Sequence, residues 1–117
     1  MKRIDWLKKR CIPCEGGVPA LTKNEVLRYL RDLKNWTLMS DEKRVRSEFM
    51  MKDFVAAIVL INRIAKLAQK EDHHPNIHLT GYRKLVITLS THAIGGLSEN
   101  DFILAAKIDR LPKKLKT

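Results

Sequence analysis

Four histidines are the side chains of this sequence best suited to acid–base chemistry: His73, His74, His78 and His92. Imidazole is the only side chain whose ordinary pKa lies near neutrality, so grouped histidines suit proton transfer or metal binding. His73 and His74 stand together before Pro75, while His92 follows two hydroxyl residues. If the two segments are neighbours in space, the three imidazoles share one site; otherwise they are ordinary polar surface. His78 alternates with apolar residues, and we expect no role for it.

Two cysteines offer a competing interpretation as metal ligands. Cys11 and Cys14 have the C-x₂-C spacing typical of zinc sites, but the sequence contains no second such pair. Pro75 interrupts any helix that could present His74 and His78 together. We therefore expect no metal, and two reduced thiols in an irregular segment, with structural zinc as the alternative. The sequence also has no glycine-rich phosphate-binding motif and no nucleophile elbow.

The elements that must position these residues follow from the apolar pattern and from helix caps. Thr22 with Glu25, and Ser98 with Asp101, have the spacing of capping boxes at helix starts. The periodicity predicts helices over 23–34, 51–70 and from Ser98 to about residue 109, and strands over 36–39, 44–49, 77–82 and 84–91. This α-β-β-α-β-β-α order predicts the α+β class, with a four-stranded antiparallel sheet covered by helices on one face.

The long helix is unusual because it is apolar on nearly every side over Phe54 to Ile61. Arg63, Lys66 and Lys70 mark a single polar stripe. In a domain this small, such a helix is expected to pack on the sheet and also to meet another subunit.

Charge is concentrated at the two ends of the chain. The net charge is +10, yet residues 1–14 and 107–117 each carry five basic residues against one acidic, and the 92 residues between carry 13 against 11. We therefore expect solvated basic ends rather than a nucleic-acid surface, which remains the alternative. The 117 residues suit a basic leader, one domain and a basic tail, over 1–21, 22–111 and 112–117 respectively.

No segment predicts a membrane location. The longest apolar run, Phe54 to Ile61, is far shorter than the roughly 20 residues that span a bilayer. The charged N-terminus is not followed by an apolar stretch of signal-peptide length. We expect a cytoplasmic protein.

The joint spacing of several motifs resembles the pterin-4a-carbinolamine dehydratase family. The motifs are His-His-Pro at 73–75, an aromatic at Tyr82, Thr-His at 91–92 and an acid at Asp101. Residues 33–36 and 51–54 are similar to other parts of the family pattern, and 11–21 resembles a leader of some bacterial members. Gln69 departs from it, because the family usually has a charged residue there.

The resemblance implies both a fold and a reaction. It implies a four-stranded antiparallel sheet with three helices, assembled as homodimers or homotetramers, and dehydration of a 4a-hydroxytetrahydropterin to the quinonoid dihydropterin in pterin recycling. His73 and His92 would transfer protons, and His74 would orient the pterin. The substrate-lining residues would be Asp72, Ser90, Thr91 and Ala93. No metal or prosthetic cofactor would be required; a non-catalytic interaction protein of the same fold is the alternative.

Overall fold

The fold is known from a computed structural model, which describes residues 4–13 and 18–117. A short 3₁₀ turn at Trp6–Lys8 precedes the main elements, and another, at His92–Ile94, precedes the last helix. The helices are α1 (Lys23–Leu30), α2 (Phe54–Glu71) and α3 (Glu99–Arg110), and the strands are β1 (Thr37–Leu38), β2 (Val45–Met50), β3 (Asn76–Thr80) and β4 (Lys84–Leu89). The predicted α+β order is confirmed.

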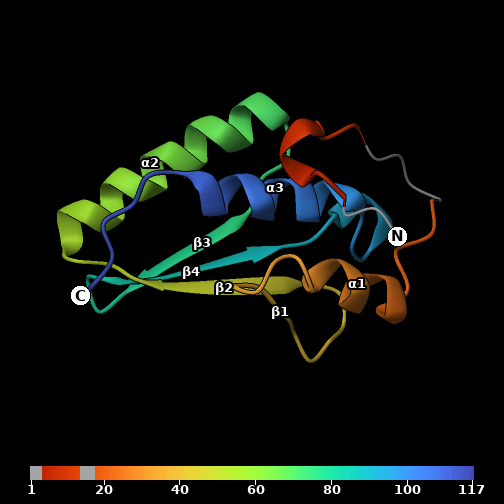
Figure 1. The fold of residues 1–117 in the computed structure, drawn as a ribbon, viewed down its shortest axis with the longest axis horizontal. Helices are drawn as coiled ribbons and strands as arrows, with labels where there is room; N and C mark the ends of the chain where they lie inside the picture. The colour runs from red at the N-terminus through yellow and green to blue at the C-terminus, as the bar shows by residue number, and fades with distance from the viewer. Residues whose placement is uncertain (1–3, 14–17) are drawn as a thin grey trace.

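The four strands form one antiparallel sheet in the order β1-β2-β4-β3. Leu85, Ile87 and Leu89 on β4 are buried, as the alternation of that strand predicts. Helices α2 and α3 run side by side over one face of the sheet, and α1 lies beside its end (Figure 1). The core therefore lies between the sheet and these helices.

The long helix begins three residues later than the sequence predicts. Asp53 caps it, with its Oδ1 accepting a hydrogen bond from the Ala56 amide at 2.8 Å. Before this cap, Met51 is fully buried and its amide donates to the Arg83 carbonyl. The Lys52 amide donates to the Lys114 carbonyl, so the C-terminal segment is hydrogen-bonded to the residues before α2 and does not extend freely into solvent. Backbone pairing thus displaces the first turn of the expected helix.

The first helix ends at Leu30, not near residue 34. Arg31 and Asp32 donate their amides three residues back, to Arg28 and Tyr29, which tightens the chain into a 3₁₀-type turn. The two capping boxes expected from the sequence, Thr22 with Glu25 and Ser98 with Asp101, are both present.

The described part of the leader contributes to the core although most of it is irregular. Trp6 is buried, and its ring meets Tyr29 edge-on at 5.0 Å and Phe102 at 5.8 Å between centroids. Such aromatic contacts fix the path of the segment that follows.

Part of α2 carries apolar side chains that the described residues leave partly exposed. Phe54 and Val55 are 52% and 68% exposed, and Ile58 and Val59 remain more than one-third exposed. We call these four residues the α2 apolar face. Within the described residues, no helix is both long enough and apolar enough to cross a membrane.

Candidate active site

A cleft of about 410 Å³ lies where the turn after α2 meets the end of β4 and the start of α3. All seven residues that the sequence nominated line it: Asp72, His73, His74, Ser90, Thr91, His92 and Ala93. Ile12, Pro13 and Asn100 complete its lining. The structure therefore brings the three histidines together, whereas His78 lies on β3 and is not among the lining residues.

Asp72 creates the turn that sends His73 into this cleft. It ends α2 with a left-handed backbone, at φ 53° and ψ 41°. Aspartate is one of the few residues other than glycine that tolerate this conformation. The His73 amide then donates to the Ala68 carbonyl at 3.2 Å, and Pro75 prevents further helix.

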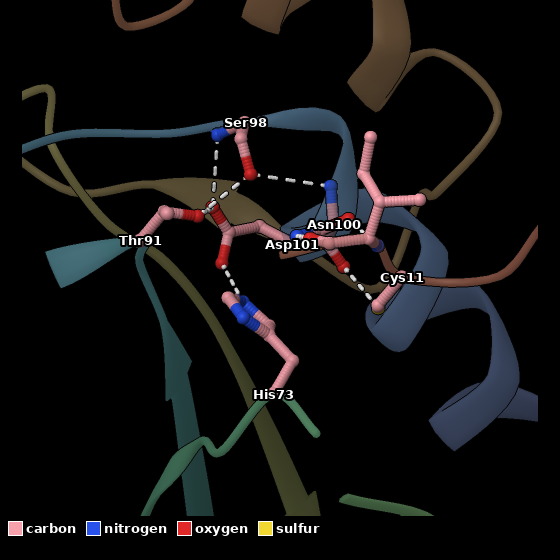
Figure 2. Close-up of polar contacts among 7 residues, drawn as sticks. Cys11, His73, Thr91, Ser98, Asn100 and Asp101 are labelled. Carbon is pink, nitrogen blue, oxygen red and sulfur yellow. Dashed lines mark hydrogen bonds and ion pairs between the residues drawn. The ribbon is translucent and has the colours of Figure 1, made fainter. Parts of the chain in front are cut away.

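His73 is held by a buried carboxylate. Its ring faces the carboxylate of Asp101 (Figure 2). Nε2 lies 2.7 Å from Oδ1 of Asp101, and the two side chains are 12% and 0% exposed. The other carboxylate oxygen of Asp101 accepts from the Thr91 hydroxyl at 2.8 Å and from the Ser98 amide at 3.0 Å. These donors compensate the loss of water around a buried carboxylate.

The pairing determines which ring nitrogen of His73 is available for chemistry. An ionised carboxylate only accepts hydrogen bonds, so Nε2 carries the proton that faces Asp101. In the neutral ring, Nδ1 is then the nitrogen that can accept a proton. A carboxylate in this position is of the kind that stabilises an imidazolium in other carboxylate–histidine pairs.

The other two cleft histidines are exposed. Nε2 of His74 lies 3.1 Å from Oε1 of Gln69, the residue that departs from the family pattern. His92 begins the short 3₁₀ turn, which Gly95 ends in a left-handed conformation at φ 64°. The Thr91 amide donates to the Gly96 carbonyl at 2.7 Å and closes the loop that contains His92. Both imidazoles can therefore reach a molecule that enters from solvent.

Of the two cysteines, only Cys11 belongs to the residues that the structure describes. Burial first, and the nearby Glu71 carboxylate second, raise the pKa of the Cys11 thiol to about 12. A thiol of this kind is not a ready nucleophile, because that role needs the thiolate. Cys14 lies outside the described residues, and within them no cluster of three or more His, Cys, Asp or Glu side chains could hold a metal ion.

Three cleft-lining residues and Asp101 were not expected at the site. The sequence marked Asp101 as a capping residue and as part of the family spacing, and those signals did not reveal its contact with His73. Ile12 and Pro13 come from the leader, where nothing in the local pattern indicates a cleft wall. Asn100 sits in the first turn of a helix, where an amide is unremarkable.

Known proteins of similar sequence cover nearly the whole chain. The family model described as "Pterin 4 alpha carbinolamine dehydratase" matches residues 19–111. A protein of Nitrosospira multiformis is 45% identical over 107 residues, which is 92% of each chain. One from Rubrobacter xylanophilus is 43% identical over 104 residues, 89% of this chain and 95% of its own. Both bear the name "Putative pterin-4-alpha-carbinolamine dehydratase".

Solved structures agree with the sequence matches. A crystal structure of a transcriptional coactivator/pterin dehydratase from Brucella melitensis is 32% identical with a TM-score of 0.72, and the match covers 77% of this chain and 95% of that one. A pterin dehydratase-like RuBisCO assembly factor of the alpha-carboxysome shares the fold, at 22% identity and a TM-score of 0.55, with 64% and 86% covered. By its family match, its relatives and its fold, this chain belongs to the pterin-4a-carbinolamine dehydratase family.

Proposed function

We propose that this protein dehydrates 4a-hydroxytetrahydropterin to the quinonoid dihydropterin, in pterin recycling. Membership of the family supports the reaction class. The observation that carries the proposal is the cleft that three imidazoles line, one of them held by the buried carboxylate of Asp101. A cleft of about 410 Å³ is of the size that small-molecule sites have.

The reaction requires one acid and one base. The C4a–oxygen bond breaks and the leaving hydroxyl takes up a proton, which gives water. The ring nitrogen next to C4a loses a proton, and its electron pair forms the new C=N bond. One proton is delivered and one removed, so two positioned imidazoles balance the reaction without a metal or a prosthetic group.

The surroundings of the histidines suggest their roles. His73 serves as the base, because Asp101 occupies its Nε2 and stabilises the imidazolium that forms. His92 serves as the acid that protonates the leaving oxygen, and His74 orients the ring. The polar groups of Asp72, Ser90 and Thr91, together with Ala93, line the substrate.

The test is a stopped-flow measurement of dehydration by the purified, chelator-treated protein. His73→Ala or His92→Ala is expected to lower kcat/KM by about 10²-fold or more, the contribution of one general acid or base. His78→Ala is the matched control, since His78 is an exposed imidazole on β3 outside the cleft lining. Wild-type protein without activity, or an equal loss in the control, would overturn the proposal.

Nucleic-acid binding through the basic ends is the alternative function, and it is not enzymatic. Trimming the ends would remove Trp6 from the core and shorten α3, so charge neutralisation is the cleaner test. The residues to change to Gln are the exposed Lys8, Arg10, Lys114 and Lys116. We expect this variant to keep full dehydratase activity; salt-sensitive retention of the wild type on DNA, lost in the variant, would favour the alternative.

A further inference from the structure

The leader reaches the cleft along a fixed path. Trp6 is anchored in the core against Tyr29 and Phe102. Three residues later, the Lys9 ammonium pairs with the Glu99 carboxylate at the start of α3, at 2.8 Å. The segment that follows is thus held against α3 before it reaches the histidines.

Asn100 then holds the backbone of Ile12 at two points. Its Oδ1 accepts from the Ile12 amide at 3.0 Å, and its Nδ2 donates to the Ile12 carbonyl at 2.6 Å. Asn100 is only 4% exposed. An amide side chain can satisfy both groups of one residue, whereas a carboxylate has no donor for the carbonyl. The contact therefore fixes the position of one particular leader residue.

Glu71 holds the residue before it. Oε1 of Glu71 accepts from the Cys11 amide at 2.9 Å, and Oε2 accepts from the Lys107 ammonium at 2.9 Å. Glu71 directly precedes Asp72 and His73, and Asn100 directly precedes Asp101. The two groups that hold the leader are thus chain neighbours of the groups that build the His73–Asp101 pair.

This arrangement places Ile12 at the edge of the cleft, and its side chain is exposed. Ile12 lines the cleft with Pro13, and it also lines a neighbouring pocket that includes Val18, Leu21 and Ile103. It is 69% exposed although the chain around it is held by buried polar groups. A pterin has a polar rim and two flat faces of low polarity. An exposed branched aliphatic side chain at the edge of the cleft is suited to pack against such a face while the imidazoles meet the rim.

We propose that Ile12 contacts the flat face of the pterin and helps determine specificity, with Asn100 and Glu71 as the positioning residues that hold it there. The inference rests on the proposed dehydration. It adds a leader residue to the site, and this residue lies outside the segment that the family model matches, 19–111.

The first experiment compares Ile12→Ala with Leu7→Ala. Leu7 is a matched control, because it is an exposed aliphatic of the same leader and does not line the cleft. Steady-state dehydration gives kcat and KM, and calorimetric titration with 7,8-dihydrobiopterin gives Kd. Ile12→Ala is expected to raise KM and Kd about 5- to 10-fold, through lost apolar contact, with kcat within about twofold. Leu7→Ala is expected to change neither.

The second experiment tests the positioning role of Asn100. Asn100→Asp keeps the size of the side chain but removes the donor to the Ile12 carbonyl. It is expected to raise Kd for 7,8-dihydrobiopterin about as much as Ile12→Ala does. The double variant is expected to have a Kd no higher than that of Asn100→Asp alone. Additive losses would show that Asn100 acts on binding by another route. Thermal unfolding of each variant reports any general loss of stability.

The outcomes separate this inference from the proposed function. A wild-type enzyme that is active, with an Ile12→Ala variant that binds and turns over like it, overturns the inference and leaves the function standing. A wild type that is inactive but binds 7,8-dihydrobiopterin more tightly than Ile12→Ala overturns the function and supports the contact. A wild type that neither binds nor reacts overturns both.

Discussion

Nε2 of His73 lies 2.7 Å from Oδ1 of Asp101, and this contact joins the turn after α2 to the first turn of α3. The same carboxylate accepts from the Ser98 amide, so one side chain caps a helix and orients an imidazole. Thr91, at the end of β4, donates to it as well. A substitution at Asp101 therefore affects both fold and chemistry, and the two effects need separate measurements.

Asp101→Asn is expected to lower kcat/KM by about 10²-fold, the scale of one proton-transfer group. If the amide oxygen of the variant keeps the Thr91 and Ser98 contacts, its NH₂ faces Nε2 of His73. The ring must then adopt the other tautomer, which leaves no acceptor on Nδ1. Lost charge-assisted hydrogen bonds should also reduce the free energy of unfolding by about 1–3 kcal/mol. Stopped-flow rates and urea unfolding measure the two effects.

Asp53→Asn is the control for this substitution. Asp53 also accepts a backbone amide at a helix start, as the N-cap residue of α2, and it does not line the cleft, so its variant should keep wild-type kinetics. Wild-type turnover by Asp101→Asn would contradict the role assigned to the His73–Asp101 pair.

Gln69→Glu tests whether the imidazole of His74 takes part in the rate. A carboxylate 3.1 Å from Nε2 would favour the protonated ring, which the neutral amide does not do. If that ring influences turnover, the pH midpoint of kcat/KM should move upward in Gln69→Glu and not in Gln69→Ala. Identical pH profiles for all three proteins would remove His74 from the titrating groups.

Glu71 makes the attachment of the leader sensitive to acid. Burial acts to raise its pKa, but the hydrogen bonds from the Cys11 amide and the Lys107 ammonium outweigh it and hold the pKa below the ordinary 4.5. An acid with a lowered folded-state pKa stabilises the fold above its ordinary pKa and loses this contribution as pH falls through the folded value. Stability should therefore decline below pH 4.5.

Glu71→Gln isolates this contribution. At neutral pH the variant should lose about 1–3 kcal/mol of unfolding free energy, because Lys107 loses its charged partner. The difference from wild type should shrink as pH falls below 4.5, as measured by urea unfolding at several pH values. Glu42→Gln, at an exposed ion pair with Lys23, is the control and should change little. A difference that is constant with pH would contradict the assignment.

The α2 apolar face is expected to bury itself between copies of the chain. We expect homodimers or homotetramers in solution, and Val55→Glu with Val59→Glu should raise the dissociation constant by about 10²-fold or more, since unpaired charges would be buried. Sedimentation velocity measures the change. Lys66→Glu, on the exposed polar stripe of the same helix, is the control. A wild type that is monomeric at micromolar concentration would refute this expectation.

Local patterns predicted most of the elements. The alternation of β4 and both capping boxes are properties of a few neighbouring residues, and the structure confirms them. The early start assigned to the long helix was wrong, because the pairing of Met51 with the Arg83 and Leu115 regions competes with helix and involves residues far along the chain.

Local sequence patterns could not predict contacts between segments that are distant in the chain. The spacing of His73, His74 and His92 left a shared site open and the family resemblance implied one, and the cleft brings them together. The contact of Asp101 with His73, which lies 28 residues away in the sequence, gave no local signal. Nor did the docking of the leader, which depends on Trp6 meeting Tyr29 and Phe102 in the finished core.

The three-way junction at Asp101 has a consequence for folding kinetics. His73, Thr91 and Asp101 belong to separate segments of the chain. The contacts of Asp101 with the other two residues therefore cannot form until the last helix has docked on the sheet. Recovery of turnover during refolding should therefore lag behind the return of helical signal. On heating, loss of turnover should coincide with the main melting transition, because that helix carries much of the buried core and cannot detach before it.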